Sequence, residues 1–247
     1  MSVSIIMPYY KKREFVGIAI ESALSQTYQD FEIIIIYDDE NLDDFEYIKA
    51  FENNDLRIKV IKNKFKIGAG LSRNIGIKNS SNKFIAFLDC DDVWKKNKLQ
   101  NQISYMNENK IDFSFTAYDI VDYSNKKIGE RKAKKILNFS DLIKSCDIGL
   151  STVLLKKKIL NEKKYRFPDL ITKEDYVLWL MLAKDGIKLM GLDENLVKWR
   201  KCKNSLSSST FQKLKDGYKV YRNYLGYGKL KSLFYLINLS INFILKN

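Results

Sequence analysis

Residues 84–94 have the sequence FIAFLDCDDVW, in which an apolar run ends in three aspartates within four positions. The run predicts a buried strand over 84–88, and charges of one sign this close together repel unless water or a cation screens them. Side chains two positions apart on an extended chain face the same way, so Asp89 and Asp91 could share a hard divalent cation. Spacing alone leaves two interpretations open: a metal site, or a solvated turn in which acidic residues end a strand.

The preceding segments alternate between strand and helix patterns. We predict strands over 3–7 (ended by Pro8), 31–36 and 57–61, and helices over 14–27 and 71–78. The strand over 31–36 is apolar at nearly every position, which is typical of a parallel sheet buried on both faces. The alternation predicts an α/β fold with a mostly parallel central sheet, in which ligands bind beyond the carboxyl ends of the strands.

The second half of the chain is less regular. We predict strands over 113–118 and 151–155 and an amphipathic helix over 175–184. The last 47 residues, from Lys201, contain nine Lys or Arg and one acid, so a surplus of eight positive charges out of thirteen lies there.

Composition narrows the possible chemistry. The chain has 247 residues, 45% of them hydrophobic, which excludes wholesale disorder, and its net charge of +13 favours polyanions, anionic lipid surfaces or phosphorylated substrates. Because the chain has no histidine, acid–base chemistry must use Asp, Glu, Lys, Tyr or Cys. A metal would be held largely by oxygen, which indicates Mg²⁺ or Mn²⁺. Three widely spaced cysteines indicate a reducing compartment, and we expect no signal peptide at the N-terminus.

Two further segments suit a phosphorylated ligand. Asp38 and Asp39 follow the apolar strand over 31–36 and could accept hydrogen bonds from a ribose or a base, or simply form a solvated turn. In GAGLSRN, residues 68–74, the glycines let the backbone approach a phosphate, and Arg73 could clamp a diphosphate. An ordinary turn is the alternative.

The segment TKED, residues 172–175, precedes an apolar helical stretch. It resembles a capping box, and it also offers a carboxylate as general base in a chain without histidine. Near the C-terminus, residues 233–245 are apolar apart from three polar positions and have lysines on both sides. This stretch of 13 residues is too short to span a bilayer, which takes about 20 residues. This stretch could lie in the interface of an anionic membrane or pack on the domain.

Together these motifs resemble family 2 glycosyltransferases of the GT-A fold. The resemblance covers about residues 3–210 and rests on several motifs in order: VSIIMPYY (3–10), AIESALSQTY (19–28), DFEIIIIYDD (30–39), LSRNIG (71–76), FIAFLDCDD (84–92) and KEDYVLW (173–179). It implies a Rossmann-like nucleotide-sugar-binding half (1–110), an acceptor-binding half (111–205) and a basic amphipathic helical tail (206–247).

The resemblance also implies roles for single residues. Asp39 would meet the uracil of a UDP-sugar, Tyr10 would stack near the base, and Arg73 would serve the nucleotide or diphosphate. Asp89 and Asp91 would hold the ribose and an Mn²⁺ or Mg²⁺ ion, with Asp91 the closer ligand. Asp175 would be the catalytic base, with Glu174 beside it. The full set expected to bind the nucleotide sugar is Pro8, Tyr10, Asp38, Asp39, Arg73, Asp89 and Cys90.

The expected activity is inverting transfer of one sugar to a glycan or lipid-linked acceptor in bacterial surface-glycan synthesis, by a cytoplasmic enzyme peripheral to the inner face of the plasma membrane. Many relatives have Tyr-Arg-x-His where this chain has Trp199-Arg-Lys-Cys202, so Cys202 replaces a histidine, for which Lys201 or Lys203 could compensate. The Gln-x-x-Arg-Trp motif of processive synthases is absent, which favours a single addition. The alternatives are a nucleotidyltransferase and a basic nucleic-acid-binding protein; against the second, the charge lies in the tail and not among aromatics along a strand surface.

Overall fold

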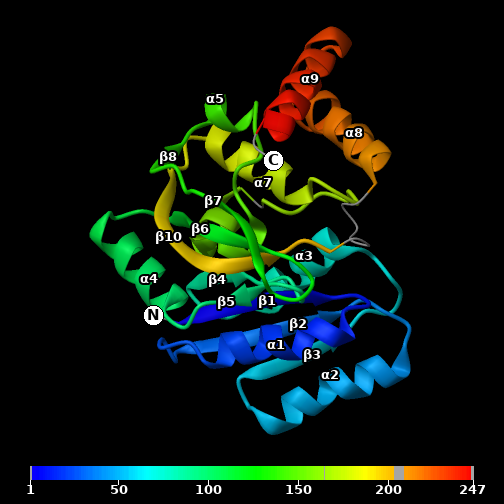
Figure 1. Cartoon of the computed structure of the whole chain (residues 1–247), viewed down its shortest axis with the longest axis vertical. Coiled ribbons are helices and arrows are strands. Elements are labelled where there is room, and N and C mark those ends of the chain that lie inside the picture. The colour runs from blue at the N-terminus through cyan, green and yellow to red at the C-terminus, as the bar shows by residue number, and fades with distance from the viewer. Residues whose placement is uncertain (1, 164, 203–208, 246–247) are drawn as a thin grey trace.

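The computed structural model describes residues 2–163, 165–202 and 209–245. Within those residues, one sheet has ten strands in the order β3-β2-β1-β4-β9-β6-β10-β5, with β7 paired to β6 and β8 to β10 (Figure 1). The strands are β1 Val3–Tyr9, β2 Phe31–Tyr37, β3 Ile58–Lys62, β4 Phe84–Phe87, β5 Val93–Trp94, β6 Phe113–Val121, β7 Lys127–Arg131, β8 Ile136–Leu137, β9 Leu154–Lys156 and β10 Leu189–Arg200.

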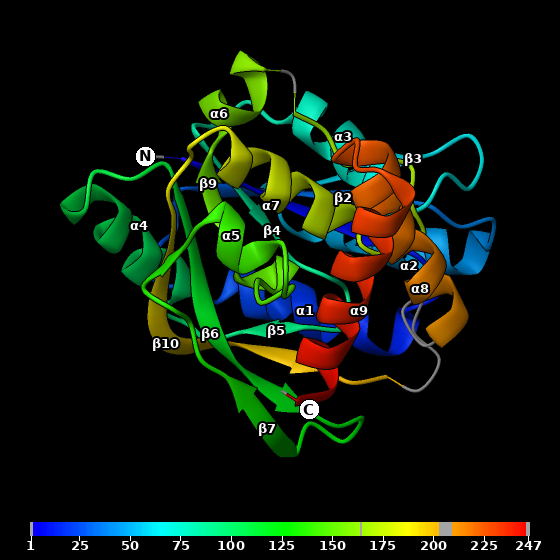
Figure 2. The ribbon, with the colours of Figure 1, turned by 90° about the horizontal axis from the view of Figure 1, so that it is seen from above.

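The helices cover both faces of this sheet (Figures 1 and 2). Helices α8 and α9 lie at the end of the molecule opposite α2 (Figure 1). The helices are α1 Arg13–Leu24, α2 Leu42–Asn54, α3 Ala69–Asn79, α4 Lys98–Glu108, α5 Phe139–Leu142, α6 Lys157–Glu162, α7 Glu174–Lys184, α8 Thr210–Lys219 and α9 Lys229–Leu245, with a 3₁₀ turn at Leu150–Thr152 and a π turn at Val220–Tyr224.

The predicted α/β class with a mostly parallel sheet is confirmed. Strands β3, β2, β1 and β4 are parallel neighbours, and β6 and β10 are parallel to each other, whereas β9 and β5 run antiparallel to their neighbours. Because β9 runs antiparallel to both of its neighbours, β4 and β6, these two strands point the same way. The carboxyl ends of β1, β2, β3, β4, β6 and β10 therefore lie at the same edge. The sheet is continuous across residue 110, so the proposed halves share one sheet and their division remains a prediction about function.

Two predicted strand boundaries were wrong, and helix α2 was not predicted. β1 continues through Pro8 to Tyr9, although proline has no amide hydrogen to donate. The pairing of β1 with β4 ends at Ile6 and Phe87, so no hydrogen bond from position 8 to β4 is required. The strand expected over 151–155 starts only at Leu154, since the residues before it form the 3₁₀ turn. We did not predict α2, whose only buried residues are Asp44 and Ile48, too few for a clear apolar period.

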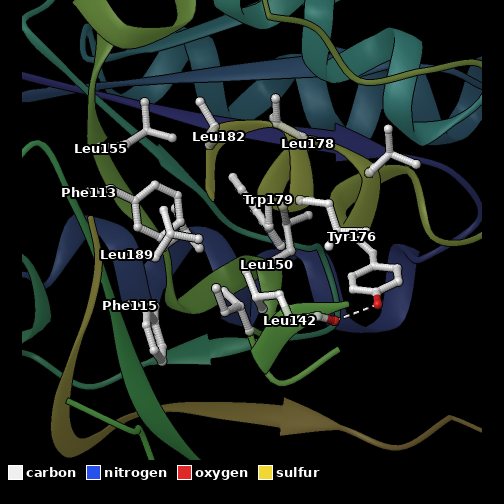
Figure 3. Packing of buried hydrophobic residues seen from close by; sticks show 14 of the residues in the cluster. Phe113, Phe115, Leu142, Leu150, Leu155, Tyr176, Leu178, Trp179, Leu182 and Leu189 are labelled. Atoms are coloured by element: carbon white, nitrogen blue, oxygen red, sulfur yellow. Dashed lines mark hydrogen bonds between the residues drawn. The ribbon is translucent and has the colours of Figure 1, made fainter. Parts of the chain in front are cut away.

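Strand alternation sends neighbouring residues to two hydrophobic cores. Ile5 and Met7 pack on the α1 side, whereas Ile6 joins the core formed with α3 and α7. In that second core the Trp179 ring of α7 lies edge-on to Phe113 at 5.1 Å between ring centroids (Figure 3). Because α7 is buried along most of its length, this packing fixes where its first residues, Glu174 and Asp175, emerge.

The approach of α3 to β1 generates a test of the fold. A Cβ atom on Gly76 would lie 2.5 Å from Cγ2 of Ile6, so Gly76→Ala must push the helix from the sheet. We expect Gly76→Ala to lower the free energy of unfolding by about 1–3 kcal/mol in urea denaturation. Gly228→Ala is the matched control, because a Cβ there meets nothing within 4 Å. Equal stability of the two variants would contradict the described contact.

Candidate active site

The predicted acidic residues gather at the edge where the parallel strands end. Asp38 follows β2, Asp89 follows β4, and the segment Tyr10–Lys12 follows β1. Arg200, the last residue of β10, reaches the same region, because it donates to the Asp91 carbonyl at 3.0 Å. The fold therefore brings together residues that lie far apart in sequence.

Residues 89–92 form a turn, so the extended geometry from which we paired Asp89 with Asp91 is wrong. The Asp92 amide donates to the Asp89 carbonyl at 3.0 Å, which bends the chain directly after β4. Both side chains still reach the surface, with 31% of the Asp89 and 19% of the Asp91 side chain exposed. Cys90 between them is buried, and its thiol contacts the Pro8 carbonyl at 3.2 Å.

The third aspartate, Asp92, braces this turn from inside and was given no role in the sequence interpretation. Its buried carboxylate accepts the Ser151 hydroxyl at 2.6 Å and the Arg200 amide at 3.0 Å. Burial, with Asp91 and Asp89 close by, raises the pKa of Asp92 well above its usual range. Ser151 also accepts the Asp89 amide at 3.1 Å, so one hydroxyl ties both ends of the turn together.

Arg73 of α3 joins the acidic turn to the start of α7. Its guanidinium donates to Asp89 at 2.8 Å and to Glu174 at 2.7 Å, while only 4% of the side chain is exposed. Burial disfavours the charge, but the two carboxylates more than compensate and raise the pKa of Arg73. The residue expected to clamp a diphosphate is thus paired with two carboxylates.

The two acids at the start of α7 have perturbed ionisation. Burial raises the pKa of Glu174 to about 7, although Arg73 opposes the shift. Burial also raises the pKa of Asp175. The positive charge of Arg73 opposes this shift, and the negative charge of Asp89 adds to it. Asp175 directly follows Glu174, which Arg73 links to Asp89 of the acidic turn.

Lys12 is a cation at the site that we did not predict. Its ammonium lies 2.8 Å from Oδ2 of Asp91, and the Cys202 thiol lies 3.6 Å from the same oxygen. Cys202 is therefore beside the aspartate that we expected to bind metal. The basic run at 11–13, directly after the first strand, was the only signal in the sequence for Lys12. Lys203 lies outside the described residues.

The metal expected at this turn would have few protein ligands. Among the residues that the structure describes, no group of three or more Cys, Asp and Glu side chains is arranged to hold an ion. Asp89 and Asp91 are nevertheless hard oxygen donors with accessible side chains, and Mg²⁺ is often held by one or two carboxylates plus substrate phosphates. The donor set fits an ion that arrives with a diphosphate, provided that Lys12 moves.

A cleft with a volume of about 340 Å³ adjoins Asp39. Its lining residues are Lys11, Arg13, Glu14, Asp39, Asn41 and Asp44. The Asp39 carboxylate accepts the Lys11 amide at 3.2 Å and the Glu40 amide at 2.8 Å. Nearby, the Lys66 ammonium lies 3.8 Å from the centre of the Tyr10 ring, and contact with Lys66 and Lys11 lowers the pKa of Tyr10.

Asp38 is buried and shapes the glycine loop. Its carboxylate accepts the backbone amides of Ile67 at 2.9 Å and Gly68 at 2.7 Å, and the Asn63 side chain at 2.8 Å. Gly68 has φ +90°, a backbone angle that glycine adopts without strain. Asp38 is thus placed to hold the loop that precedes α3, which carries Arg73.

The capping box suggested by residues 172–175 does not form. α7 starts after Lys173, which has φ 69° and makes no capping bond with its side chain. The Thr172 amide and hydroxyl instead donate to the buried Asp216 of α8, at 3.1 and 3.2 Å. Thr172 therefore holds the C-terminal helices against the segment that leads into Glu174 and Asp175.

The two ion pairs of Arg73 generate a test of the site. We expect Arg73→Met to lower the free energy of unfolding by about 3–5 kcal/mol in urea, because Asp89 and Glu174 lose their shared counter-charge. Arg57→Met is the control, since it breaks a surface pair with Asp55 and should change stability by about 1 kcal/mol or less. A loss for Arg73→Met no larger than that of the control would show that the buried pairs stabilise little.

Curated relatives resemble this chain over nearly its whole length. It is 37% identical over 237 residues to the UDP-Glc:alpha-D-GlcNAc-diphosphoundecaprenol beta-1,3-glucosyltransferase WfgD of Escherichia coli, covering 96% of this chain and 91% of that protein. It is 31% identical to the putative teichuronic acid biosynthesis glycosyltransferase TuaG of Bacillus subtilis, with 89% and 87% covered.

Solved structures share the fold at low sequence identity. TarS residues 1–349 of S. aureus in complex with UDP-GlcNAc superposes with a TM-score of 0.76 at 19% identity, over 96% of this chain and 70% of that one. The mannosyltransferase PcManGT of Pyrobaculum calidifontis in complex with GDP-Man and Mn²⁺ gives 0.69 at 12%, over 95% and 69%. These likenesses confirm the expected GT-A fold.

The sequence profile of glycosyl transferase family 2 matches residues 4–164, which include β1, the acidic turn and Arg73. This match and the 37% identity confirm the resemblance drawn from the motifs. The protein is an enzyme, a glycosyltransferase, and the chain belongs to glycosyl transferase family 2.

Proposed function

We propose that this enzyme transfers one sugar from a UDP-sugar to a lipid-linked glycan, with inversion at the anomeric carbon, during synthesis of a bacterial surface polysaccharide. One observation carries the proposal: Arg73 joins Asp89 of the acidic turn to Glu174 beside Asp175. The names of WfgD and TuaG, which specify a UDP-Glc donor with a diphosphoundecaprenol acceptor and teichuronic acid biosynthesis, support the donor, the acceptor and the setting. Family membership decides against the nucleotidyltransferase and nucleic-acid-binding alternatives.

The cleft beside Asp39 is the proposed nucleotide site. Asp39 would accept a hydrogen bond from the base, and Tyr10 would stack near it, with Lys11 and Lys66 close enough to attract phosphate charge. Pro8 and the Cys90 backbone would form the floor, since the Cys90 thiol points inward to Pro8. Asp38 would act through the loop that it holds.

Two carboxylates with accessible side chains, Asp89 and Asp91, support a divalent cation at the site. Arg73 and Lys12 already pair with them, so the ion would share these carboxylates with protein cations or displace Lys12. Burial is the main cause of the raised pKa of both α7 acids, and Arg73 opposes it. Asp89 and Asp91 would hold Mn²⁺ or Mg²⁺, which when bound supplies positive charge for the departing diphosphate.

The chemical step would need one base from this chain. An acceptor hydroxyl oxygen bonds to the anomeric carbon as the bond from that carbon to the diphosphate breaks, and Asp175 takes the hydroxyl proton. Burial suits Asp175 to this role, because a raised pKa makes its carboxylate a stronger base. Arg73, through Glu174, would keep the start of α7 at the distance from the turn that the reaction requires.

The metal assignment is tested with Asp91→Asn. We expect the purified enzyme to release UDP from a UDP-sugar in the presence of Mn²⁺ and to stop on addition of EDTA. The rate of UDP release should fall by at least about 10²-fold in Asp91→Asn, because the variant loses a carboxylate ligand of the ion that stabilises the diphosphate charge. Asp55→Asn, in a surface ion pair, is the control and should keep full activity. Full activity of Asp91→Asn, or activity indifferent to EDTA, would remove the metal role.

The base is tested with Asp175→Asn and with pH. We expect the variant to lose about 10²- to 10⁴-fold in transfer rate while UDP still binds, as measured by calorimetry. In the unchanged enzyme kcat/KM should fall as pH drops through the raised pKa of Asp175, so its acid limb lies above the ordinary aspartate value of about 4. Glu174→Gln should keep that limb. Loss of UDP binding in Asp175→Asn, or loss of the limb in Glu174→Gln, would contradict the assignment.

A further inference from the structure

Helix α9 has an exposed apolar stripe. Seven large hydrophobic side chains, each 49–86% exposed, recur at helical spacing and fall within about a third of the helix circumference. They are Leu230, Leu233, Phe234, Ile237, Ile241, Ile244 and Leu245. The helix has 17 residues, and no helix among the described residues is long and apolar enough to cross a bilayer.

The opposite face of α9 is fixed to the protein. Ser232 and Leu239 are buried, and the Tyr235 ring stacks on Tyr221 with 5.6 Å between centroids. Gly217 of α8 allows a close approach, since a Cβ there would lie 2.8 Å from a methyl group of Leu236. The outward direction of the stripe is therefore set by packing, and Figure 1 shows α9 at the end of the molecule away from α2.

The segment that carries the stripe is basic. Lys229 and Lys231 flank the stripe at the start of α9, and the preceding helical segment adds Lys213, Lys215, Lys219 and Arg222. Among the described residues 209–245 the one acid is Asp216, which is buried, accepts hydrogen bonds from Thr172 and Gln212, and pairs with Lys219. The segment thus combines exposed apolar side chains with an excess of positive charge.

We propose that the exposed face of α9 lies on an anionic bilayer surface, with its apolar stripe in the headgroup region and its lysines against lipid phosphates. Amphipathic helices with lysines beside an apolar face bind in this way. A second copy of the chain is the alternative occupant of an exposed apolar face, and the oligomeric state in solution distinguishes it from a bilayer.

The exposed face of α9 is connected to the candidate active site. Asp216 binds Thr172, two residues before Glu174, so the membrane-facing helices are tied to the segment that carries the candidate base. This reasoning rests on the proposed lipid-linked acceptor, whose reactive sugar would stand just above the bilayer. Binding to lipid, however, can be measured without any sugar transfer.

Flotation with vesicles of phosphatidylcholine, with and without phosphatidylglycerol, tests the proposal. We expect the full chain to bind the anionic vesicles and to lose on the order of tenfold or more in affinity with Ile237→Ser plus Ile241→Ser. Lys229→Gln plus Lys231→Gln should cause a loss of similar order, as should raising the salt from about 0.1 M to about 1 M. UDP release from the donor should stay unchanged in all variants.

The control is Leu42→Ser plus Leu56→Ser, which removes two exposed apolar side chains far from α9 and should leave vesicle binding intact. Circular dichroism with thermal unfolding confirms that each variant is folded. Absence of binding to anionic vesicles, or an equal loss in the control, would overturn the proposal. So would a dimer in sedimentation velocity that Ile237→Ser plus Ile241→Ser dissociates while vesicle binding persists. Vesicle binding by an enzyme that releases no UDP would leave this proposal standing and remove the proposed function.

Discussion

The candidate active site depends on the buried guanidinium of Arg73, which lies between Asp89 and Glu174. Taking three charged groups out of water is costly, and the cost is offset only because each carboxylate receives a charge-assisted hydrogen bond. The planar fork of arginine can address two carboxylates in fixed directions, which a lysine ammonium does less well. This arrangement keeps the turn after β4 and the start of α7 together through a single residue.

Around Arg73, buried residues hold the acidic turn in place, while two of its aspartates reach the surface. Asp92, Ser151 and Arg200 hold the turn from inside, through bonds to its backbone and to one another. Asp89 and Asp91 can therefore face outward on a turn whose own conformation is already satisfied. Lys12 pairs with Asp91, and Arg73 pairs with Asp89. The proposed metal would therefore bind carboxylates that already contact cations of the protein.

The C-terminal helices also have a packed inner face and an exposed outer face. Their inner face is packed through Ser232, Leu239 and the Tyr221–Tyr235 pair, and Asp216 fastens them to Thr172. The outer face of α9 is thereby connected to the segment before α7 through packed helices and the bonds between Thr172 and Asp216. In the proposed membrane-bound arrangement, these helices would set the position of the site relative to the bilayer.

The sequence by itself determined the alternation of strands and helices, because hydrophobic period and strand length are local properties. It also placed acids at the ends of β2 and β4, and hence at one edge of the sheet. Tertiary structure alone decided which charges meet: Arg73 and Glu174 are 101 residues apart, and Cys202 and Asp91 are 111 apart. Tertiary structure also gave residues 89–92 the conformation of a turn, where the sequence had predicted extended chain. Thr172 donates a hydrogen bond to Asp216 and does not form the predicted capping box. Such outcomes depend on how distant elements pack, since a buried polar group takes the partner that packing places beside it, and no local pattern encodes that choice.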